Sequence, residues 1–341
     1  MRRATGRGLG AAVTGGVLAA ALALGGCAAP DRPTADSAGR LPAADDAGRL
    51  PAAAPRIAPG PRAAPGRAPA EKSCKNDSYR PSGPPPAVGH MPAGSTMAAI
   101  VRRGRLIAGV DQNSYLFGYR DPLTGQLDGY EIELLRRIAT ALFGSPDRIQ
   151  FRTITSAARI PVLTTDPNKV DIVVDSMTIN CERWQSVAFS SDYMDAGQRV
   201  LVPRQSTARS IKDLGGKKIC AARKTTSIDT LASLRNPSVV PVGVDDWTDC
   251  LMLMQLGEVD AASTDDTILI GLAAQDPNTK LIGPRFTDEP HGIAMQPKQT
   301  DFVRFVNAVL EQMRQDGSLK ALARKWLGTD NFAPPAVTYR D

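Results

Sequence analysis

Histidine is nearly absent from this chain, because its 341 residues include only two, His90 and His291. A histidine-based catalytic triad or a histidine-rich metal centre therefore has almost no residues to form it. Cysteine is also scarce, with five residues and no two of them at CxxC spacing. The spacing gives no support to a zinc site, the main alternative use of these cysteines. The sequence thus predicts neither a metal nor a cofactor.

Long apolar runs are missing after the first 27 residues, so no later segment is predicted to span a bilayer. The first 27 residues begin with arginines, continue through an apolar Ala/Leu/Gly/Val run and end in Leu24-Gly25-Gly26-Cys27. This order is typical of an export signal, and its end resembles a bacterial lipoprotein box. We therefore expect lipidation at Cys27, with an uncleaved membrane anchor as the alternative. Either anchor places the remainder on the outer face of the bacterial cytoplasmic membrane.

Bulky apolar residues are few in residues 28–94, where alanine, proline, glycine and arginine dominate. Such a segment buries too little apolar surface to offset the entropy of ordering it. We expect residues 28–94 to be a disordered tether between the lipid anchor and a globular body.

An excess of charge of one sign is absent from that body. The formal net charge of the whole chain is +6, but residues 96–341 contain 29 basic and 29 acidic residues. Nucleic-acid binding needs a basic face, so this balance gives no reason to expect a nucleic-acid partner. We expect the body to be a monomer.

Strands and helices are predicted to alternate from Ser95 onward. A first series contains strands over 105–111, 149–154 and 170–174 with a helix after residue 130, and a second βα series fills residues 200–288. The chain then returns and ends in two helices. This order predicts an α/β protein in which residues 95–199 and 289–341 form lobe 1 and residues 200–288 form an inserted lobe 2. Because open α/β sheets bind ligands at the carboxyl ends of their strands, a ligand cleft is expected between the lobes.

The segment after the predicted buried strand 172–174 carries the clearest functional signal. Ser176 and Thr178 stand two residues apart, so in extended backbone their hydroxyls point to the same side. Arg183 follows at a helix start, and its guanidinium can hold a small carboxylate through two parallel hydrogen bonds. This combination favours carboxylate binding without catalysis. An ordinary strand end followed by a surface salt-bridging arginine is the alternative.

Four cysteines remain once Cys27 is assigned to a lipid. An exported protein meets an oxidising environment, in which disulfides form and an even number of cysteines pairs completely. Cys220 and Cys250 lie in neighbouring predicted elements and are the expected first pair. Cys74 with Cys181 follows by elimination and would join the end of the tether to the body.

Several segments, in this order along residues 96–330, resemble one known family. They are Leu106–Asp111, Asp128–Leu134, Ser176–Arg183, Ile211–Lys217, Gly257–Ala261 and Asp316–Gly328. The chain is similar in these segments to the extracellular solute-binding proteins of polar amino-acid ABC importers, the family-3 type with glutamine- and glutamate/aspartate-binding members. The resemblance implies a two-lobed periplasmic-binding-protein-like fold (type II), no enzymatic activity, an amino-acid ligand and an ABC transporter permease as partner.

The resemblance also implies roles for individual residues. Arg183 would pair with the ligand α-carboxylate, assisted by Thr178 and by the loop at Thr225 and Thr226. Asp265 would bind the α-ammonium, and its neighbour Asp266 would cap a helix.

The side-chain pocket would lie around Arg159, which the resemblance places against a ligand carboxylate. Asp111 begins a segment similar to glutamate-binding members, and Tyr115 lies one position from the aromatic residue that stacks on glutamine. These similarities imply glutamate, aspartate or their amides as ligand. Asp175 departs from the family pattern because an acid stands where glycine is usual.

Two other functions remain open at this point. A sensory lipoprotein that signals to a membrane partner would have the same ligand chemistry. A dehydratase-like enzyme on the same architecture would need a general acid or base, for which the candidates are Asp111, Asp175 and Asp265.

Overall fold

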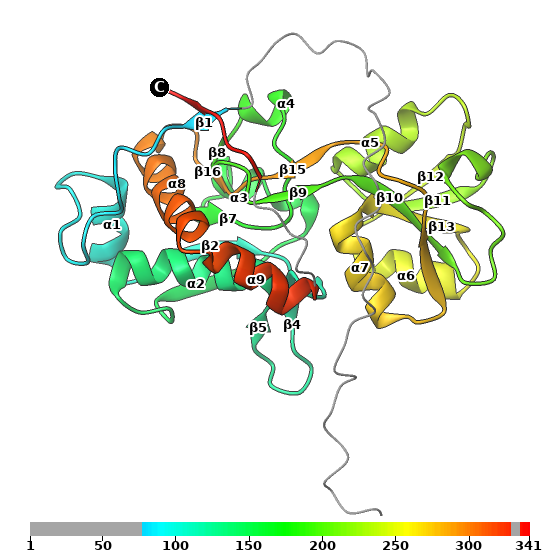
Figure 1. Ribbon diagram of the computed structural model, residues 1–341, viewed down its shortest axis with the longest axis horizontal. Helices are drawn as coiled ribbons and strands as arrows, with labels where there is room; N and C mark the ends of the chain where they lie inside the picture. The colour runs from blue at the N-terminus through cyan, green and yellow to red at the C-terminus, as the bar shows by residue number, and fades with distance from the viewer. Residues whose placement is uncertain (1–76, 329–334) are drawn as a thin grey trace, which may run out of the picture. The chain divides into compact units, whose positions relative to one another are not determined.

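Two five-stranded sheets, each with its own hydrophobic core, dominate the computed structural model (Figure 1). The structure describes residues 77–328 and 335–341. We call the sheet that contains residues 106–110, together with its helices, lobe 1. The sheet that contains residues 218–222 and its helices are lobe 2. The α/β architecture with two lobes was predicted from the sequence and is confirmed.

Lobe 1 combines a mostly parallel sheet with helices. Its strands are β2 (Leu106–Val110), β6 (Ile149–Thr153), β7 (Ile172–Val173), β8 (Ala188–Phe189) and β16 (Ala294–Met295). Its helices are α1 (Thr96–Arg103), α2 (Tyr130–Phe143), the 3-10 helix η1 (Ser156–Ala158), α3 (Pro161–Thr164), α4 (Cys181–Trp184), α8 (Thr300–Gln315) and α9 (Ser318–Leu327). In the strand order β6-β2-β7-β16-β8, the first three strands are parallel and β16 is antiparallel to both of its neighbours.

Lobe 2 is formed by one continuous stretch of chain. Its strands are β10 (Gln198–Pro203), β11 (Lys218–Ala222), β12 (Val240–Val244), β13 (Ala261–Asp265) and β14 (Thr279–Ile282). Its helices are the 3-10 helix η2 (Ile211–Asp213), α5 (Thr226–Ser233), α6 (Trp247–Gln255) and α7 (Asp266–Gln275). The strand order is β12-β11-β13-β10-β14. The predicted Cys220–Cys250 disulfide is present, with an S–S distance of 2.04 Å, and joins β11 to α6.

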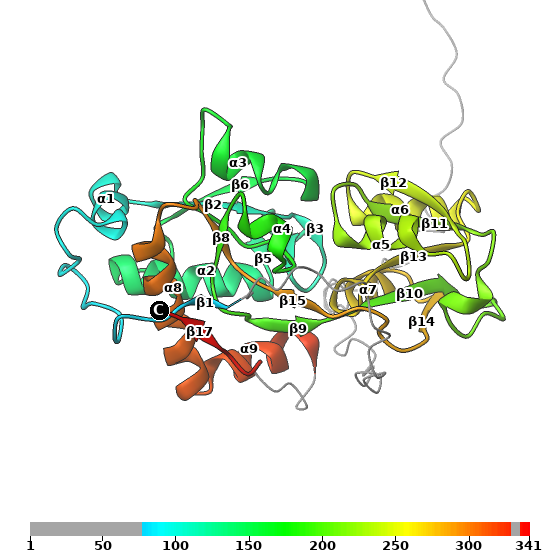
Figure 2. The same cartoon turned by 90° about the horizontal axis from the view of Figure 1, so that it is seen from above.

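Two antiparallel strands, β9 (Met194–Ala196) and β15 (Glu289–His291), lie between the two sheets and pair with each other (Figure 2). The chain leaves lobe 1 through β9 and returns through β15. The boundary between the lobes was expected between residues 199 and 200. Those residues belong to β10, which pairs with β13 and β14 inside the lobe 2 sheet. A further small sheet contains β3 (Asn113–Ser114), β4 (Gly118–Arg120) and β5 (Leu127–Asp128).

The end of the predicted tether is ordered in the structure. β1 (Ser78–Tyr79) pairs in parallel with β17 (Tyr339–Arg340). The buried Ser78 hydroxyl donates a hydrogen bond to the carbonyl oxygen of Phe189 (2.7 Å). The prediction of disorder up to residue 94 is therefore wrong for this strand, because its polar groups find partners on the body. The signal segment, Cys27 and Cys74 lie outside the described residues, while Cys181 is disulfide-bonded.

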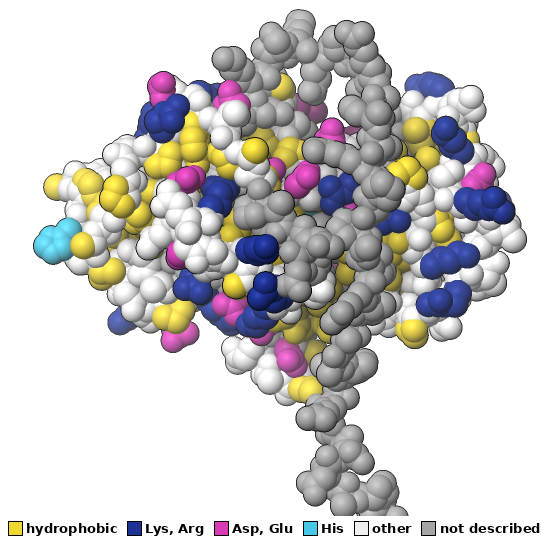
Figure 3. All heavy atoms as spheres, in the orientation of Figure 1, with side chains coloured by type: hydrophobic (Ala, Val, Ile, Leu, Met, Phe, Trp, Pro, Cys, Tyr) yellow, Lys and Arg dark blue, Asp and Glu magenta, His cyan; other side chains and the backbone are white. Residues whose placement is uncertain are grey.

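Basic and acidic side chains both occur across the face of the molecule in Figure 3, as the balanced composition of residues 96–341 predicts. Within the part of the chain that the structure describes, every helix is too short or too polar to cross a membrane.

Candidate ligand-binding site

Predicted site residues from both lobes meet at the ends of strands and helices. Thr178 of lobe 1 lies against Thr226, the first residue of α5 in lobe 2, with 3.3 Å between their Oγ1 atoms. Thr178 also forms an isolated antiparallel bridge with His291 of β15. His291 in turn places Nε2 2.8 Å from Oδ2 of Asp265, at the end of β13. These contacts bring together Thr178 and Thr226, which were expected near the ligand α-carboxylate, and Asp265, which was expected near the α-ammonium.

Arg183 is held by the short helix α4. The Asn180 side chain caps this helix by accepting a hydrogen bond from the Arg183 backbone N–H (2.9 Å). Nη1 of Arg183 donates to the carbonyl oxygen of Thr178 (2.7 Å). The residue is only 8% exposed and has no ion-pair partner within residues 77–328 and 335–341. Burial and the nearby Arg159 lower its pKa to about 10, so the guanidinium is charged at neutral pH and suited to an anionic group.

Ser176 does not have the extended backbone that we expected. Its φ of 41° is left-handed, so the alternation that aligns Ser176 with Thr178 is lost. The backbone N–H and the hydroxyl of Ser176 both donate to Oε1 of Glu131, at 2.7 and 3.0 Å. The Tyr193 hydroxyl donates to the same oxygen at 2.5 Å. Glu131, which is buried in the first turn of α2, was missed because its partners lie far away in the sequence.

Arg159 lies between η1 and α3 and is buried. Its Nε donates to the carbonyl oxygen of Ser156 (3.0 Å), and its Nη1 donates to that of Asp175 (2.9 Å). These bonds hold the backbone of the turn after β7. The role against a ligand carboxylate remains a prediction.

Asp111 uses its carboxylate within its own turn. It accepts hydrogen bonds from the N–H groups of Gln112 (2.6 Å) and Asn113 (2.9 Å) and from the Ser114 hydroxyl (2.5 Å). Burial raises its pKa, and these hydrogen bonds partly oppose that rise. Asp111 therefore stabilises the loop that follows β2.

Tyr115, in the same loop, stacks edge-on against Tyr119 with 4.9 Å between the ring centroids. Its carbonyl oxygen approaches α7 of lobe 2, where a Cβ on Gly271 would lie only 2.3 Å away. A side chain at Gly271 would push this loop away, so glycine allows the two lobes to approach here.

Asp265 occupies the N-cap position of α7, so the expectation that Asp266 caps this helix is wrong. Asp266 instead forms an ion pair with Arg285 (2.7 Å). Oδ2 of Asp265 meets His291, whereas its buried Oδ1 has no hydrogen-bond partner. Burial lowers the pKa of His291, but the hydrogen bond and the charge of Asp265 outweigh it and raise that pKa overall. One oxygen of Asp265 thus remains available for an ammonium group.

Thr225 is the N-cap of α5. Its hydroxyl accepts from the Ile228 N–H (3.3 Å) and donates to the Ala222 carbonyl oxygen (2.7 Å). The neighbouring Thr226 donates to Oε2 of Glu289 (2.9 Å). Burial and the nearby Asp265 raise the pKa of Glu289. Glu289 was not predicted from the sequence, because a glutamate at a predicted chain return carries no signal of burial.

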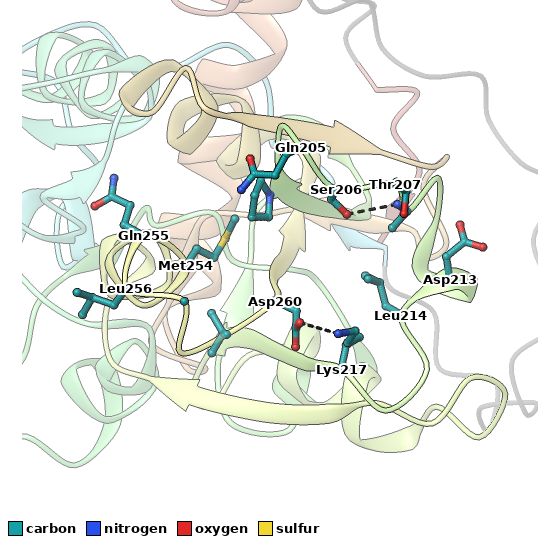
Figure 4. Close-up of a pocket in the computed structure, with 14 residues that line it drawn as sticks. Gln205, Ser206, Thr207, Asp213, Leu214, Lys217, Met254, Gln255, Leu256 and Asp260 are labelled. Carbon is teal, nitrogen blue, oxygen red and sulfur yellow. Dashed lines mark hydrogen bonds and ion pairs between the residues drawn. The ribbon is translucent and has the colours of Figure 1, made fainter.

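A separate hollow of about 840 Å³ lies on lobe 2 (Figure 4). It is lined by residues that include Gln205, Lys217, Gln255 and Asp260, and Lys217 forms an ion pair with Asp260 (3.0 Å). Lys217 directly precedes β11, so the hollow lies near the start of this strand, whereas the candidate site follows its end. None of the predicted ligand-binding residues lines this hollow.

The raised pKa of Asp192 leads us to expect that the free energy of unfolding depends on pH. Burial raises its pKa to about 7, although it accepts a hydrogen bond from the Met194 N–H (2.9 Å). The unfolded carboxyl titrates near pH 4, so the folded state binds more protons between about pH 4 and 7. The free energy of unfolding therefore falls as pH rises through this window. We expect Asp192→Asn to reduce this fall by on the order of 1 kcal/mol after solvent screening.

Urea unfolding of the unmodified protein and of Asp192→Asn, each at pH 5 and pH 8, gives the fall in the free energy of unfolding for both proteins. The difference between the two falls is the contribution of Asp192. Asparagine keeps the acceptor oxygen but cannot ionise, so other titrating groups cancel in the comparison. An equal fall in both proteins contradicts the prediction.

The fold and the site together define a two-lobed α/β binding protein. Residues 106–329 match the bacterial extracellular solute-binding proteins, family 3. This span exceeds half of the chain, and the chain belongs to that family. The family predicted from the sequence is thus confirmed, and the protein is a solute-binding protein rather than an enzyme.

Individual relatives agree with this assignment. The ABC transporter glutamine-binding protein GlnH of Bacillus subtilis (strain 168) is 34% identical over 236 residues, which are 69% of this chain and 85% of that protein. The glutamate-binding protein GluB of Corynebacterium glutamicum is 26% identical over 258 residues, covering 72% of this chain and 86% of its own. A solved ancestral arginine-binding protein bound to arginine has a TM-score of 0.60 and 31% identity, covering 66% of this chain and 99% of that one.

Proposed function

We propose that this protein binds a polar amino acid between its lobes and delivers it to an ABC importer. The observation that carries the proposal is the buried Arg183, which is charged and has no ion-pair partner in the described residues. It interacts electrostatically with Asp265, whose Oδ1 has no hydrogen-bond partner. An α-carboxylate would satisfy the guanidinium, and an α-ammonium would satisfy Oδ1 of Asp265. Both interactions gain strength where water is excluded.

The ligand set proposed from the sequence is glutamate, aspartate, glutamine or asparagine. The names of two relatives, which refer to glutamine and glutamate, support this set, and the arginine-binding relative adds arginine to the compounds worth testing. A sensory lipoprotein that signals to a membrane partner is the second candidate, since its ligand site would be the same.

We further propose that lipidation of Cys27 holds the protein on the outer face of the membrane. The Leu24–Cys27 sequence after an apolar run supports this anchor. Mass spectrometry of the exported protein tests it, because an unmodified Cys27 contradicts lipidation without affecting the ligand proposal.

Thermal unfolding of residues 28–341, which keep both Cys74 and Cys181, with each common amino acid tests the ligand proposal. A ligand that binds only the folded state raises the unfolding free energy by about 4 kcal/mol when present at a thousand times its Kd. For a protein of this size that corresponds to a rise in Tm of roughly 8–16 °C. We expect such a rise with at least one polar amino acid. No shift with any of the twenty would contradict amino-acid binding.

A further inference from the structure

Asp175 is a buried carboxylate without a complete set of partners. It lies just after β7, is 3% exposed, and its Oδ2 has no hydrogen-bond partner. Buried polar atoms are normally hydrogen-bonded, because leaving one unpaired costs free energy. An orphaned oxygen next to a candidate ligand site is therefore a place where a donor from the ligand can bind.

Arg159 does not supply the missing hydrogen bond to Oδ2 of Asp175. Nη1 of Arg159 donates to the backbone carbonyl oxygens of Asp175 (2.9 Å) and Ser176 (3.4 Å), not to the Asp175 carboxylate. The charge of Arg159 still favours ionisation of Asp175, while burial opposes it and raises the pKa of Asp175 well above its usual range. Asp175 therefore has a cationic neighbour but no ion pair within the described residues.

The buried titratable groups around the site include more acids than bases. The buried acids linked to it by contact or electrostatic interaction are Asp111, Glu131, Asp175, Asp265 and Glu289, and the bases are Arg159, Arg183 and His291. The ligand α-carboxylate already requires Arg183. A second carboxylate on the ligand would enter a region with more acids than bases, and like charges at close range oppose binding.

We propose that Asp175 is a specificity-determining residue that favours ligand side chains with N–H donors over side chains with a carboxylate. An amide or a guanidinium would donate to Oδ2 and satisfy it, whereas a ligand carboxylate brings no N–H donor and adds a further acid to the site. This inference rests on the proposed amino-acid binding. It departs from the expectation that Arg159 lies against a ligand carboxylate.

Isothermal titration calorimetry at pH 7.5 tests the inference with glutamine, arginine and glutamate as probes. We expect glutamine or arginine to bind the unmodified protein at least tenfold more tightly than glutamate. In Asp175→Asn, the amide can donate to a carboxylate, so glutamate should come within about threefold of glutamine. If arginine is the preferred ligand, its affinity should fall at least tenfold in this variant.

Asp171→Asn is the matched control. Asp171 is also a buried lobe 1 carboxylate, at the opposite end of β7, where it pairs with Arg103 and accepts from the Ile107 N–H (2.7 Å). The Asp171→Asn variant should bind glutamine, arginine and glutamate in the same order of affinity as the unmodified protein. The readout is a ratio within each variant, so partial loss of folded protein does not change it.

The outcomes separate this inference from the proposed function. If no amino acid binds the unmodified protein, the proposed function fails. If glutamate binds more tightly than glutamine and arginine, a protonated Asp175 donating to the ligand explains it, and the inference is overturned. An unchanged ratio in Asp175→Asn also overturns the inference while leaving amino-acid binding intact.

Discussion

Arg183→Ala is expected to remove binding of every amino acid that the protein recognises. The guanidinium is buried and charged, and it is the group that we propose receives the α-carboxylate, which all amino acids share. Removing one member of a buried charge pair costs about 3–5 kcal/mol, because the other charge is left without compensation. That corresponds to a loss in affinity of at least about a hundredfold. Calorimetry with the best ligand from the thermal screen measures this loss.

Arg152→Ala serves as the control for this experiment. Arg152 is a lobe 1 arginine of β6 that pairs with Asp166 on the surface, so its removal should leave affinity unchanged. Thermal unfolding of both variants without ligand checks that they fold. Full-strength binding by Arg183→Ala would falsify the proposed role of this residue.

Replacing Cys220 and Cys250 together with alanine is expected to destabilise lobe 2 by about 3–4 kcal/mol. The two cysteines are 30 positions apart in the sequence. The disulfide lowers the conformational entropy of the unfolded chain, and the size of this effect increases with the length of the closed loop. Both cysteines are fully buried between β11 and α6, so their loss also leaves small unfilled spaces.

Hydrogen exchange in β11 and α6 under increasing urea measures the stability of lobe 2 directly. Reduction of the unmodified protein with a thiol provides the control, since it breaks the bond without changing the packing residues. Protection that falls by less than about 0.5 kcal/mol in both cases would contradict a stabilising role for this disulfide.

The parts of the structure that could be predicted from the sequence depend on local patterns. The apolar spacing of Ile132, Leu135 and Ile138 predicted α2, and all three side chains are fully buried. Ser95 immediately precedes α1, where serine is a preferred cap, and its hydroxyl accepts from the Ala98 N–H. Such signals need only a few neighbouring residues, so the order of elements and the two lobes followed from them.

Features that depend on distant residues were not predicted. β1 and β17 are two-residue strands separated by about 260 positions, and no periodicity marks either of them. The polar contacts of Glu131 and Glu289 join segments tens of residues apart. The left-handed backbone of Ser176 is equally invisible in the sequence, because serine is not a residue that favours it.

The position of β16 between β7 and β8 determines when each sheet can be completed as the chain emerges from its N-terminal end onward. Every strand of the lobe 2 sheet is available once residue 282 has emerged, because that sheet uses one continuous stretch. The lobe 1 sheet must wait for residues 294–295, although its other four strands were made long before. Until then β7 and β8 lack the strand that joins them, and the earlier half of the nascent chain is the last to gain its full set of sheet hydrogen bonds.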